Sequence, residues 1–348
     1  MQFCSIRFYN YYIMSFKGEV YSMRKRISIL LTIIMMFVMV SGCSSKSSSS
    51  SKKNVKILLS ISDESDEFRS MLAKSAKDFA DSEKVDLVVK DAAGSIETQV
   101  SHMKEAVSGG YDAIMCTPVD STTGLQLKKA AGNLPIVFMN SSPSEELLEK
   151  DKYIYVASDE KIAGKYQAEY IADYLKNKNN IKVVLLKGEK NHAATKGRTK
   201  AVKETFKEKG IDADYVFEDN ADWSRAKAKE MFNIFLSTGR KFDCVIANND
   251  EMALGVMDSF KENKIDTSLI PIVGIDATSD ACKAIVDGGL QFTVYQSAKD
   301  QSKNAVQAAI QLGSNGELSN IENLAQDGKH IWVPFEKVTK DNAKNYMS

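Results

Sequence analysis

What the chain has little of narrows its possible functions. Its 348 residues include five Cys, at positions 4, 43, 116, 244 and 282, with no Cys-x-x-Cys pair, which argues against a disulfide framework or a cysteine zinc site. The three His are too widely separated for a histidine-rich metal site. Lys plus Arg and Asp plus Glu are equal at 46 each, so no basic excess indicates binding to nucleic acid.

Two further absences concern membranes and catalysis. There is one long apolar run, so the chain is not a polytopic membrane protein. Its 43% hydrophobic and 26% charged residues are typical of a globular protein, and its length suggests about two domains. The motifs GxSxG, Walker A, HExxH and GxGxxG are missing in their required contexts, which argues against an enzyme.

The N-terminal segment has the pattern of a secretory signal. The basic cluster Met23–Arg26 precedes fourteen mostly apolar residues, 27–40, a length typical of a signal h-region and too short for a comfortable membrane span. Val40-Ser41-Gly42-Cys43 then resembles the lipobox of bacterial lipoproteins. Residues 23–42 are therefore interpreted as a lipoprotein signal peptide and Cys43 as its lipidation site. The alternative is a plain membrane anchor that ends by chance in Gly-Cys.

The residues on either side of this signal have simpler interpretations. Residues 1–22 do not match any part of a signal peptide. They are interpreted as a misannotated extension, with Met23 as the initiator. Residues 43–54 comprise the lipidated Cys and a Ser-rich polar stretch that predicts a flexible tether. The body of the protein is thus expected outside the cell, held by a lipid at the outer face of the bacterial membrane.

From residue 55 onward, apolar runs rich in Val and Ile alternate with segments of helical spacing. Continuous apolar runs indicate strands buried on both faces. The runs are 55–61, 85–89, 112–116, 135–139, 153–157, 181–187, 213–217, 242–247, 271–275 and 290–295. The helical stripes include Phe68, Met71, Leu72, Ala76 and Phe79, then Val100, Met103 and Val107. This alternation predicts an α/β protein with two doubly wound parallel sheets of about five strands each.

Polar and aromatic side chains follow these strands, at the sheet edge where open α/β proteins bind ligands. Carboxylates and amides can each engage neighbouring hydroxyls, arginine donates in a planar fork, and aromatic faces pack on sugar C–H groups. No nucleophile–base pair is evident, so the set favours a neutral polyol over a reaction. The candidate ligand-binding residues are Asp66, Phe68, Thr117, Asn140, His192, Arg198, Trp223, Asn249, Asp276 and Gln296.

Five of the candidates also have a plainer interpretation. Asp66 and Asn249 could simply cap helices. His192 could lie in a surface loop, Trp223 in a core, and Arg198 on a solvated helix face. Their shared position after strands is what favours a site.

Three stretches resemble the type I periplasmic binding protein family, in particular its galactose/glucose-binding branch in bacterial ABC transporters. They are 184–189 with His192, Arg198 and Thr199 after it, then 245–255, and 273–277. Ribose-binding members share the last two stretches. The resemblance extends over essentially all of residues 55–348.

The resemblance implies roles for the candidate residues. Asp66 would meet the sugar, Phe68 and Trp223 would sandwich it, and the polar candidates His192, Arg198, Asn249 and Asp276 would bind its hydroxyls. Three positions depart from the galactose/glucose pattern and leave the sugar open: Thr117, Ala194 and Gln296.

No metal and no cofactor are expected, and for calcium this expectation rests on a departure from the branch that the chain resembles. The calcium-binding loop of the galactose/glucose branch is replaced here by residues 176–180, Lys-Asn-Lys-Asn-Asn, so we expect no calcium site.

The resemblance also implies an architecture and partners. Three hinge crossings are expected near 141–150, 296–298 and 330–334. One lobe would comprise 55–142 with 298–330, and the other 150–295 with 333–348. Ligand would close the lobes, and the closed form, a monomer, would dock on the membrane subunits of an ABC permease.

Alternatives remain within and outside this class. The protein could present a bound sugar to a chemoreceptor or sensor kinase, or bind ribose, xylose or an inositol. A sugar-responsive repressor would need an N-terminal helix-turn-helix, where this chain has a signal and tether. Cys116, Cys244 and Cys282 are interpreted as small buried hydrophobes.

Overall fold

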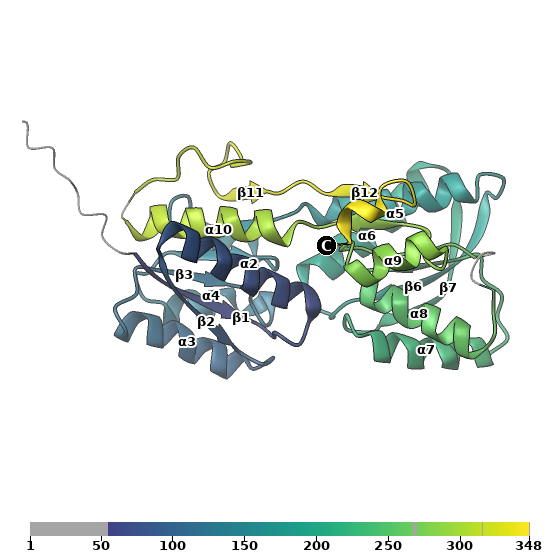
Figure 1. Ribbon diagram of the computed structural model, residues 1–348, viewed down its shortest axis with the longest axis horizontal. Helices are drawn as coiled ribbons and strands as arrows, with labels where there is room; N and C mark the ends of the chain where they lie inside the picture. The colour runs from purple at the N-terminus through teal and green to yellow at the C-terminus, as the bar shows by residue number, and fades with distance from the viewer. Residues whose placement is uncertain (1–54, 267–269, 315, 348) are drawn as a thin grey trace, which may run out of the picture. The chain divides into compact units, whose positions relative to one another are not determined.

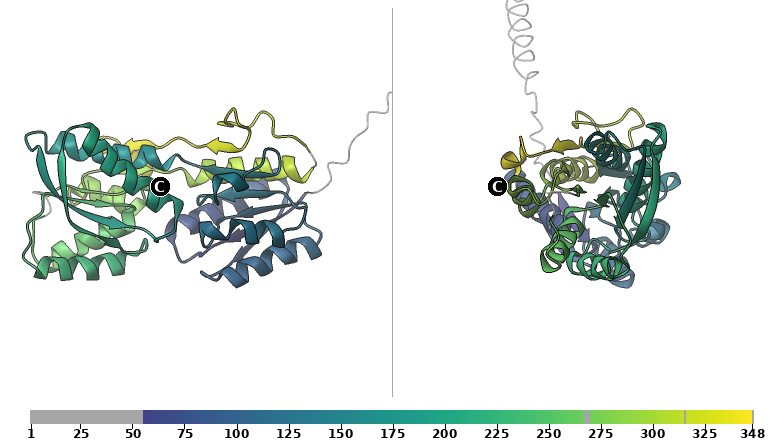
Figure 2. Two further views of the ribbon diagram at one scale, coloured as in Figure 1. Left: turned by 180° about the vertical axis from the view of Figure 1, so that it is seen from behind. Right: turned by 90° about the vertical axis from the view of Figure 1, so that its right-hand side faces the viewer.

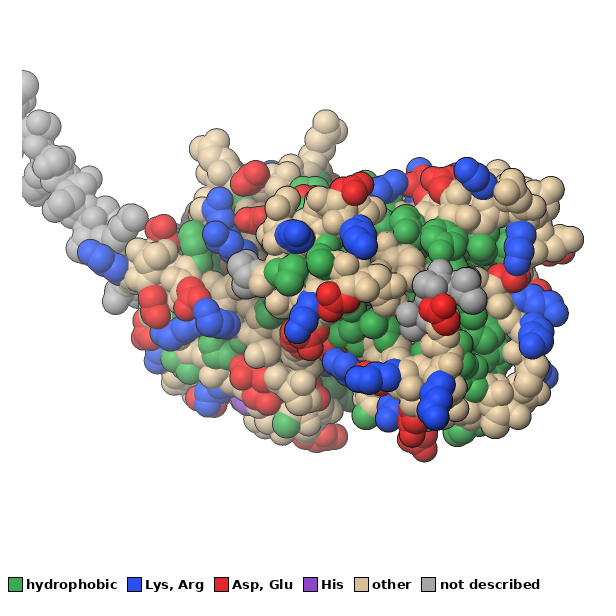
Figure 3. Space-filling view, turned by 45° about the vertical axis from the view of Figure 1, so that its right-hand side comes forward, with side chains coloured by type: hydrophobic (Ala, Val, Ile, Leu, Met, Phe, Trp, Pro, Cys, Tyr) green, Lys and Arg blue, Asp and Glu red, His purple; other side chains and the backbone are tan. Residues whose placement is uncertain are grey.

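The computed structural model describes residues 55–266, 270–314 and 316–347. The targeting segment and Cys43 lie outside these ranges. In the described part no helix is long and apolar enough to cross a bilayer. On the face shown in Figure 3, positive and negative side chains are interspersed rather than segregated.

The first sheet has six parallel strands in the order β11-β5-β4-β3-β1-β2. Strands β1, β2, β3 and β11 of this sheet are labelled in Figure 1. In chain order the strands are β1 (Lys56–Ile61), β2 (Asp86–Asp91), β3 (Ala113–Cys116), β4 (Ile136–Met139), β5 (Tyr153–Ala157) and β11 (His330–Trp332). The helices beside them are α2 (Glu67–Glu83), α3 (Ile96–Ser108), α4 (Gly124–Ala130) and α10 (Ala298–Gly313), with short 3-10 turns η1 (Ser121–Thr123) and η2 (Glu145–Leu147).

The second sheet has four parallel strands in the order β7-β6-β8-β9. They are β6 (Asn180–Lys187), β7 (Asp212–Asn220), β8 (Cys244–Ala247) and β9 (Ile272–Val273). Its helices are α5 (Glu160–Tyr174), α6 (Ala193–Glu208), α7 (Arg225–Ser237), α8 (Asp250–Glu262) and α9 (Ser279–Asp287). The antiparallel pair β10 (Thr293–Tyr295) and β12 (Glu336–Val338) continues it through single bridges, and η4 (Ala343–Tyr346) follows.

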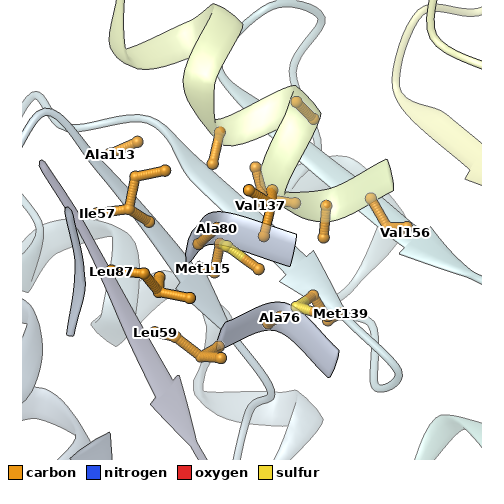
Figure 4. Close-up of a cluster of buried hydrophobic side chains, with 14 of the residues drawn as sticks. Ile57, Leu59, Ala76, Ala80, Leu87, Ala113, Met115, Val137, Met139 and Val156 are labelled. Atoms are coloured by element: carbon orange, nitrogen blue, oxygen red, sulfur yellow. The ribbon is translucent and has the colours of Figure 1, made fainter. Parts of the chain in front are cut away.

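Both faces of each sheet are buried, as the continuous apolar runs predict. Along β1, Ile57 and Leu59 pack under helices α2 and α10 (Figure 4), while Leu58 between them packs under α3 and α4. The side-chain period of two in a strand places neighbours on opposite faces, so both faces need apolar residues. The second sheet repeats this, with α7, α8 and α9 on one face and α5 and α6 on the other.

The structure confirms all ten predicted strands and corrects their grouping. β5 pairs in parallel with β4 and β11, so it belongs to the first sheet and not, as expected, to the second lobe. The chain therefore first passes to the second sheet between β5 and α5, at residues 158–159, and not within 141–150. Two short strands, β11 and β12, were not expected, so the sheets have six and four strands with a separate pair instead of about five each.

The other two passages lie between β10 and α10, at residues 296–297, and between β11 and β12, at residues 333–335. The last of these is the yellow segment joining two strand arrows in Figure 2, left. The predicted helical stripes lie in α2 and α3, although two of their residues, Met71 and Val107, are 39% and 49% exposed. Cys116, Cys244 and Cys282 are buried as expected, and burial raises the pKa of each thiol.

Candidate functional site

A cavity of about 290 Å³ lies where the strand ends of both sheets converge. All lining residues except Asp66, which is half-buried, are buried. The lining consists of Asp66, Phe68 and Arg69 at the start of α2, Asn140 after β4, His192, Ala194 and Arg198 at the start of α6, and Trp223, Asn249, Asp276 and Gln296 after β7, β8, β9 and β10. Nine of the ten candidates from the sequence are thus brought together.

Thr117 is the candidate that does not line this cavity. Its Oγ1 accepts a hydrogen bond from the backbone N–H of Ser62 at 2.7 Å, and its hydroxyl donates to Ser62 Oγ at 3.2 Å. These bonds join the ends of β1 and β3 and use the hydroxyl within the sheet. Thr117 is 1% exposed, so its role in the structure is to connect strands.

Arg198 is held rigidly from behind by Glu160, which the sequence analysis did not single out. Arg198 Nε and Nη2 donate to the two carboxylate oxygens of Glu160, at 2.5 and 3.2 Å. Nη1 donates to the Asn248 carbonyl at 2.6 Å, and the second hydrogen of Nη2 is donated to Gln296 Oε1 at 3.0 Å. Burial alone would lower the pKa of Arg198, but Glu160 raises it, so the guanidinium stays charged. Four of five N–H donors are used, which leaves one Nη1 hydrogen for a ligand.

His192 is presented as a hydrogen-bond donor. It caps α6, with Nδ1 accepting the Ala194 N–H at 3.1 Å, so the neutral ring carries its hydrogen on Nε2. Burial, and then the nearby cations Arg69, Arg198 and Lys196, hold its pKa well below the usual value. The imidazole is therefore neutral at physiological pH.

Trp223 supplies the larger aromatic wall. It has a positive φ of 63°, and its ring lies so close to Gly188 that a side chain on that glycine would collide with it. The Arg198 guanidinium lies 5.7 Å from the ring centroid, and His192 meets the ring edge-on at 5.2 Å. The buried indole Nε1 has no hydrogen-bond partner among the described residues, so this donor is available to a ligand.

The remaining polar lining groups offer both acceptors and donors. Burial first, with Asp250, Asp66 and Glu160 adding, raises the pKa of Asp276 well above its usual value, while Arg198 opposes the rise. The Nε2 of Gln296 is buried without a partner in the described part of the chain. Asp66 and Asn249 line the cavity and also cap α2 and α8, so the capping interpretation and the pocket interpretation hold together.

Arg69 is a lining residue that the sequence analysis missed. Its side chain is 6% exposed, and Nη2 donates to Glu189 Oε2 at 2.9 Å. The signal that would have found it is local: Asp66 caps α2 through the Arg69 N–H, which turns both Phe68 and Arg69 toward the strand ends. Glu160 is the first residue of α5, three positions after the end of β5, at a strand end that the sequence analysis left out.

Polar contacts join the two sets of elements around the cavity. Besides the Arg69–Glu189 ion pair, Asn191 Nδ2 donates to Asp120 Oδ2 at 3.0 Å and the Ser121 hydroxyl donates to the Asn191 carbonyl at 2.7 Å. All three contacts use the loop between β6 and α6. Within the described residues no group of three or more His, Cys, Asp or Glu could hold a metal ion.

The chain belongs to the type I periplasmic binding proteins: the family model described as a periplasmic binding protein domain matches residues 57–317. It is 34% identical over 288 residues to a putative rhizopine-binding protein of Rhizobium meliloti, which covers 81% of this chain and 89% of the relative. It is 29% identical to the D-galactose/methyl-galactoside binding periplasmic protein of Haemophilus influenzae, over 76% of this chain and 82% of the relative.

The fold also matches solved structures of this family. A solute-binding protein of an ABC transporter from Bacillus halodurans C-125, with bound myo-inositol, superposes with a TM-score of 0.75 at 27% identity, covering 84% of this chain and 97% of that one. These relatives are solute-binding proteins and not enzymes. The protein is accordingly a solute-binding protein of the periplasmic binding protein class.

Proposed function

We propose that this protein captures a monosaccharide, a hexose such as glucose or galactose, in the cavity at the strand ends and delivers it to an ABC importer. The observation that carries the proposal is the chemistry of the lining. Hydrogen-bonding groups from the ends of both sheets lie beside two aromatic side chains, and two buried donors, Trp223 Nε1 and Gln296 Nε2, have no partner among the described residues. A hydroxyl both donates and accepts, so a polyol satisfies such a mixed set.

The aromatic residues of the lining support a ring-shaped ligand. Phe68 and Trp223 are placed to pack on the C–H faces of a ring, while His192, Arg198, Asn249 and Asp276 bind its hydroxyls. Because buried polar groups need partners, a ligand that lacks a hydroxyl would be rejected.

A cyclitol is the second candidate. The superposed Bacillus halodurans structure holds myo-inositol. Here Ala194 stands where the galactose/glucose branch has an acidic side chain, so one acceptor of the hexose set is absent from a lining that is otherwise polar. A six-membered carbon ring with six hydroxyls would fill the same space.

The anchoring and assembly of the protein form part of the proposal. Cys43 would carry the lipid that holds a monomer at the outer face of the membrane, with residues 44–54 as the tether. Mass spectrometry of the N-terminal peptide from membranes tests this, since a diacylglyceryl Cys43 is expected. An unmodified Cys43 in a soluble protein would contradict it.

Calorimetric titration tests the ligand. The purified protein is unfolded and refolded to remove carried-over ligand, then titrated with glucose, galactose, ribose, xylose and myo-inositol. One-to-one binding of glucose or galactose is the expected result. Binding of myo-inositol alone would replace the hexose by the cyclitol, and no binding to any of the five would overturn the proposed ligand class.

A further inference from the structure

A second cavity adjoins the one described above. It contains about 640 Å³ of empty space, part of it open to solvent, against about 290 Å³ for the first. Its lining comprises Ser62, Asp63, Arg69, Gly94, Val119, Asp120, Glu189, Lys190, Asn191 and His192. The two linings share Arg69 and His192, so these two side chains form the wall between the cavities.

Arg69, which separates the two cavities, has guanidinium N–H donors that make no hydrogen bond to the described residues. It borders both cavities, its side chain is 94% buried, and the hydrogen bond from Nη2 to Glu189 is its only side-chain hydrogen bond to the described residues. A guanidinium has five N–H donors, and buried donors without acceptors are costly. An acceptor oxygen between the cavities would therefore be bound favourably. Because Glu189 is about one-third exposed, Arg69 is held from one side only and can adjust to a ligand.

The lining of the second cavity indicates the chemistry of its occupant. Val119 is its one aliphatic side chain, so an apolar group is not favoured. The lining carries two cations, Arg69 and Lys190, and three carboxylates, those of Asp63, Asp120 and Glu189, a net charge of −1 that disfavours an anionic group. Hydroxyls, which donate to carboxylates and accept from amides and cations, fit this lining.

We propose that the second cavity is a subsite for a neutral hydroxylated substituent on the bound sugar, so that the ligand is a glycoside or disaccharide. One ring would occupy the first cavity and the bridging oxygen would lie between the cavities, at Arg69 and His192. The second hydroxylated unit would extend toward Asp63, Val119 and Lys190. This inference rests on the proposed function, since it requires a sugar in the first cavity.

The test compares each parent sugar with its substituted forms. The refolded protein is titrated with glucose, methyl glucosides, maltose and cellobiose, and with galactose, methyl galactosides, lactose and melibiose. At least one substituted compound is expected to bind no more than tenfold more weakly than its parent. If every substituted compound binds more than tenfold more weakly than a parent that does bind, the subsite is overturned while the proposed function stands. If neither parents nor substituted forms bind, the proposed function falls and this inference falls with it.

A variant that fills the second cavity gives an independent readout. Val119 lines the second cavity and not the first. The substitution Val119→Phe should therefore lower the affinity for the substituted ligand at least tenfold and change the affinity for the parent sugar less than twofold. Val107→Phe, on an exposed position of α3 in the same lobe, is the matched control and should change neither affinity. Equal effects of Val119→Phe on both ligands, or no effect on either, would contradict the subsite. If Val119→Phe does not fold, Lys190→Ala with Asp63→Asn replaces it under the same criteria.

Discussion

Trp223 and Trp332 are the two tryptophans of the chain, and of these Trp223 lines the cavity, so fluorescence can report on the site. Sugar binding should change the emission of the protein, and the change should persist in Trp332→Phe and disappear in Trp223→Phe. Trp223→Ala should weaken binding about tenfold or more, because an aromatic contact contributes about 0.5–1.5 kcal/mol beyond its buried area. Unchanged affinity in Trp223→Ala, with a native circular dichroism spectrum, would remove Trp223 from the site.

His192 gives a pH dependence of stability with a definite sign. Its pKa in the folded protein lies well below the value of about 6.5 in an unfolded chain. Below pH 6.5 the unfolded state therefore binds a proton that the folded state does not, and stability falls as pH falls, by at most about 1.4 kcal/mol per pH unit. The contribution of His192 is fully present above pH 6.5.

The variant His192→Asn isolates this effect. Asparagine can still cap α6 but does not titrate. The buried carboxyls Asp250 and Asp276, whose pKa values are raised by burial, act in the opposite direction in both proteins and cancel in the comparison. Urea unfolding between pH 5 and 7.5 should show a difference between wild type and variant that grows toward pH 5. Parallel curves would contradict a neutral buried His192.

The sequence could predict those binding-site residues that lie just after a strand, because the strand is recognised from the neighbouring residues alone. Asp276 and Trp223 follow strands directly, so an apolar run followed by polar or aromatic residues locates them. Thr117 meets the same criterion and still points elsewhere, because its hydroxyl bonds to Ser62, a partner 55 residues away. The support of Arg198 by Glu160 is equally non-local, since it depends on how two helices pack.

That packing depends on glycines. Helices α5 and α6 approach closely at Gly164, where an added methyl group would collide with the Arg198 carbonyl, and α7 and α8 approach in the same way at Gly255, against the Arg225 carbonyl. Gly164→Ala should destabilise the fold by about 1–3 kcal/mol through overpacking, and should also weaken sugar binding because it displaces Arg198 from Glu160.

Gly255→Ala is the matched control for this prediction. It should lower the free energy of unfolding by a similar amount, measured by chemical denaturation, and leave sugar affinity within about twofold, because Gly255 lies beyond the first turn of α8 and away from the cavity. Equal losses of affinity in the two variants would mean that overpacking acts on the site only through general loosening. Such a result would contradict a specific role of the α5–α6 contact in placing Arg198.

Most strands and helices could be predicted from the sequence, but the pairing of the strands into sheets could not. Apolar runs in β1 or β6 reflect burial on both faces, which is a property of the segment alone. The assignment of β5 to the second lobe was wrong because sheet membership is set by its partners β4 and β11, and β11 lies some 170 residues further along the chain. β11 and β12 have three residues each, too few for a periodic pattern to distinguish them from loop.

In the whole molecule, the contacts of the β6–α6 loop with α2 and η1 can set how long a ligand is retained. Asn191 lies outside the first cavity, yet its side chain bonds Asp120 and its carbonyl accepts from Ser121, both in the lobe of the first sheet. These bonds exist only while the lobes are in contact, so they stabilise the closed form without touching a sugar in the first cavity. A ligand enclosed by such a form leaves when the form opens.

Asn191→Ala should therefore raise the dissociation rate of the bound sugar about three- to tenfold, because one hydrogen bond contributes about 0.5–1.5 kcal/mol. The association rate should stay nearly constant, since it is set by encounter with the open form. Stopped-flow fluorescence measures both rates. Asn233→Ala, which removes a half-buried amide bonded to Glu262, Ser259 and Asn263 within the second lobe, should change neither rate. A slower association with unchanged dissociation would show that Asn191 acts on ligand entry, and would contradict its role in holding the lobes together.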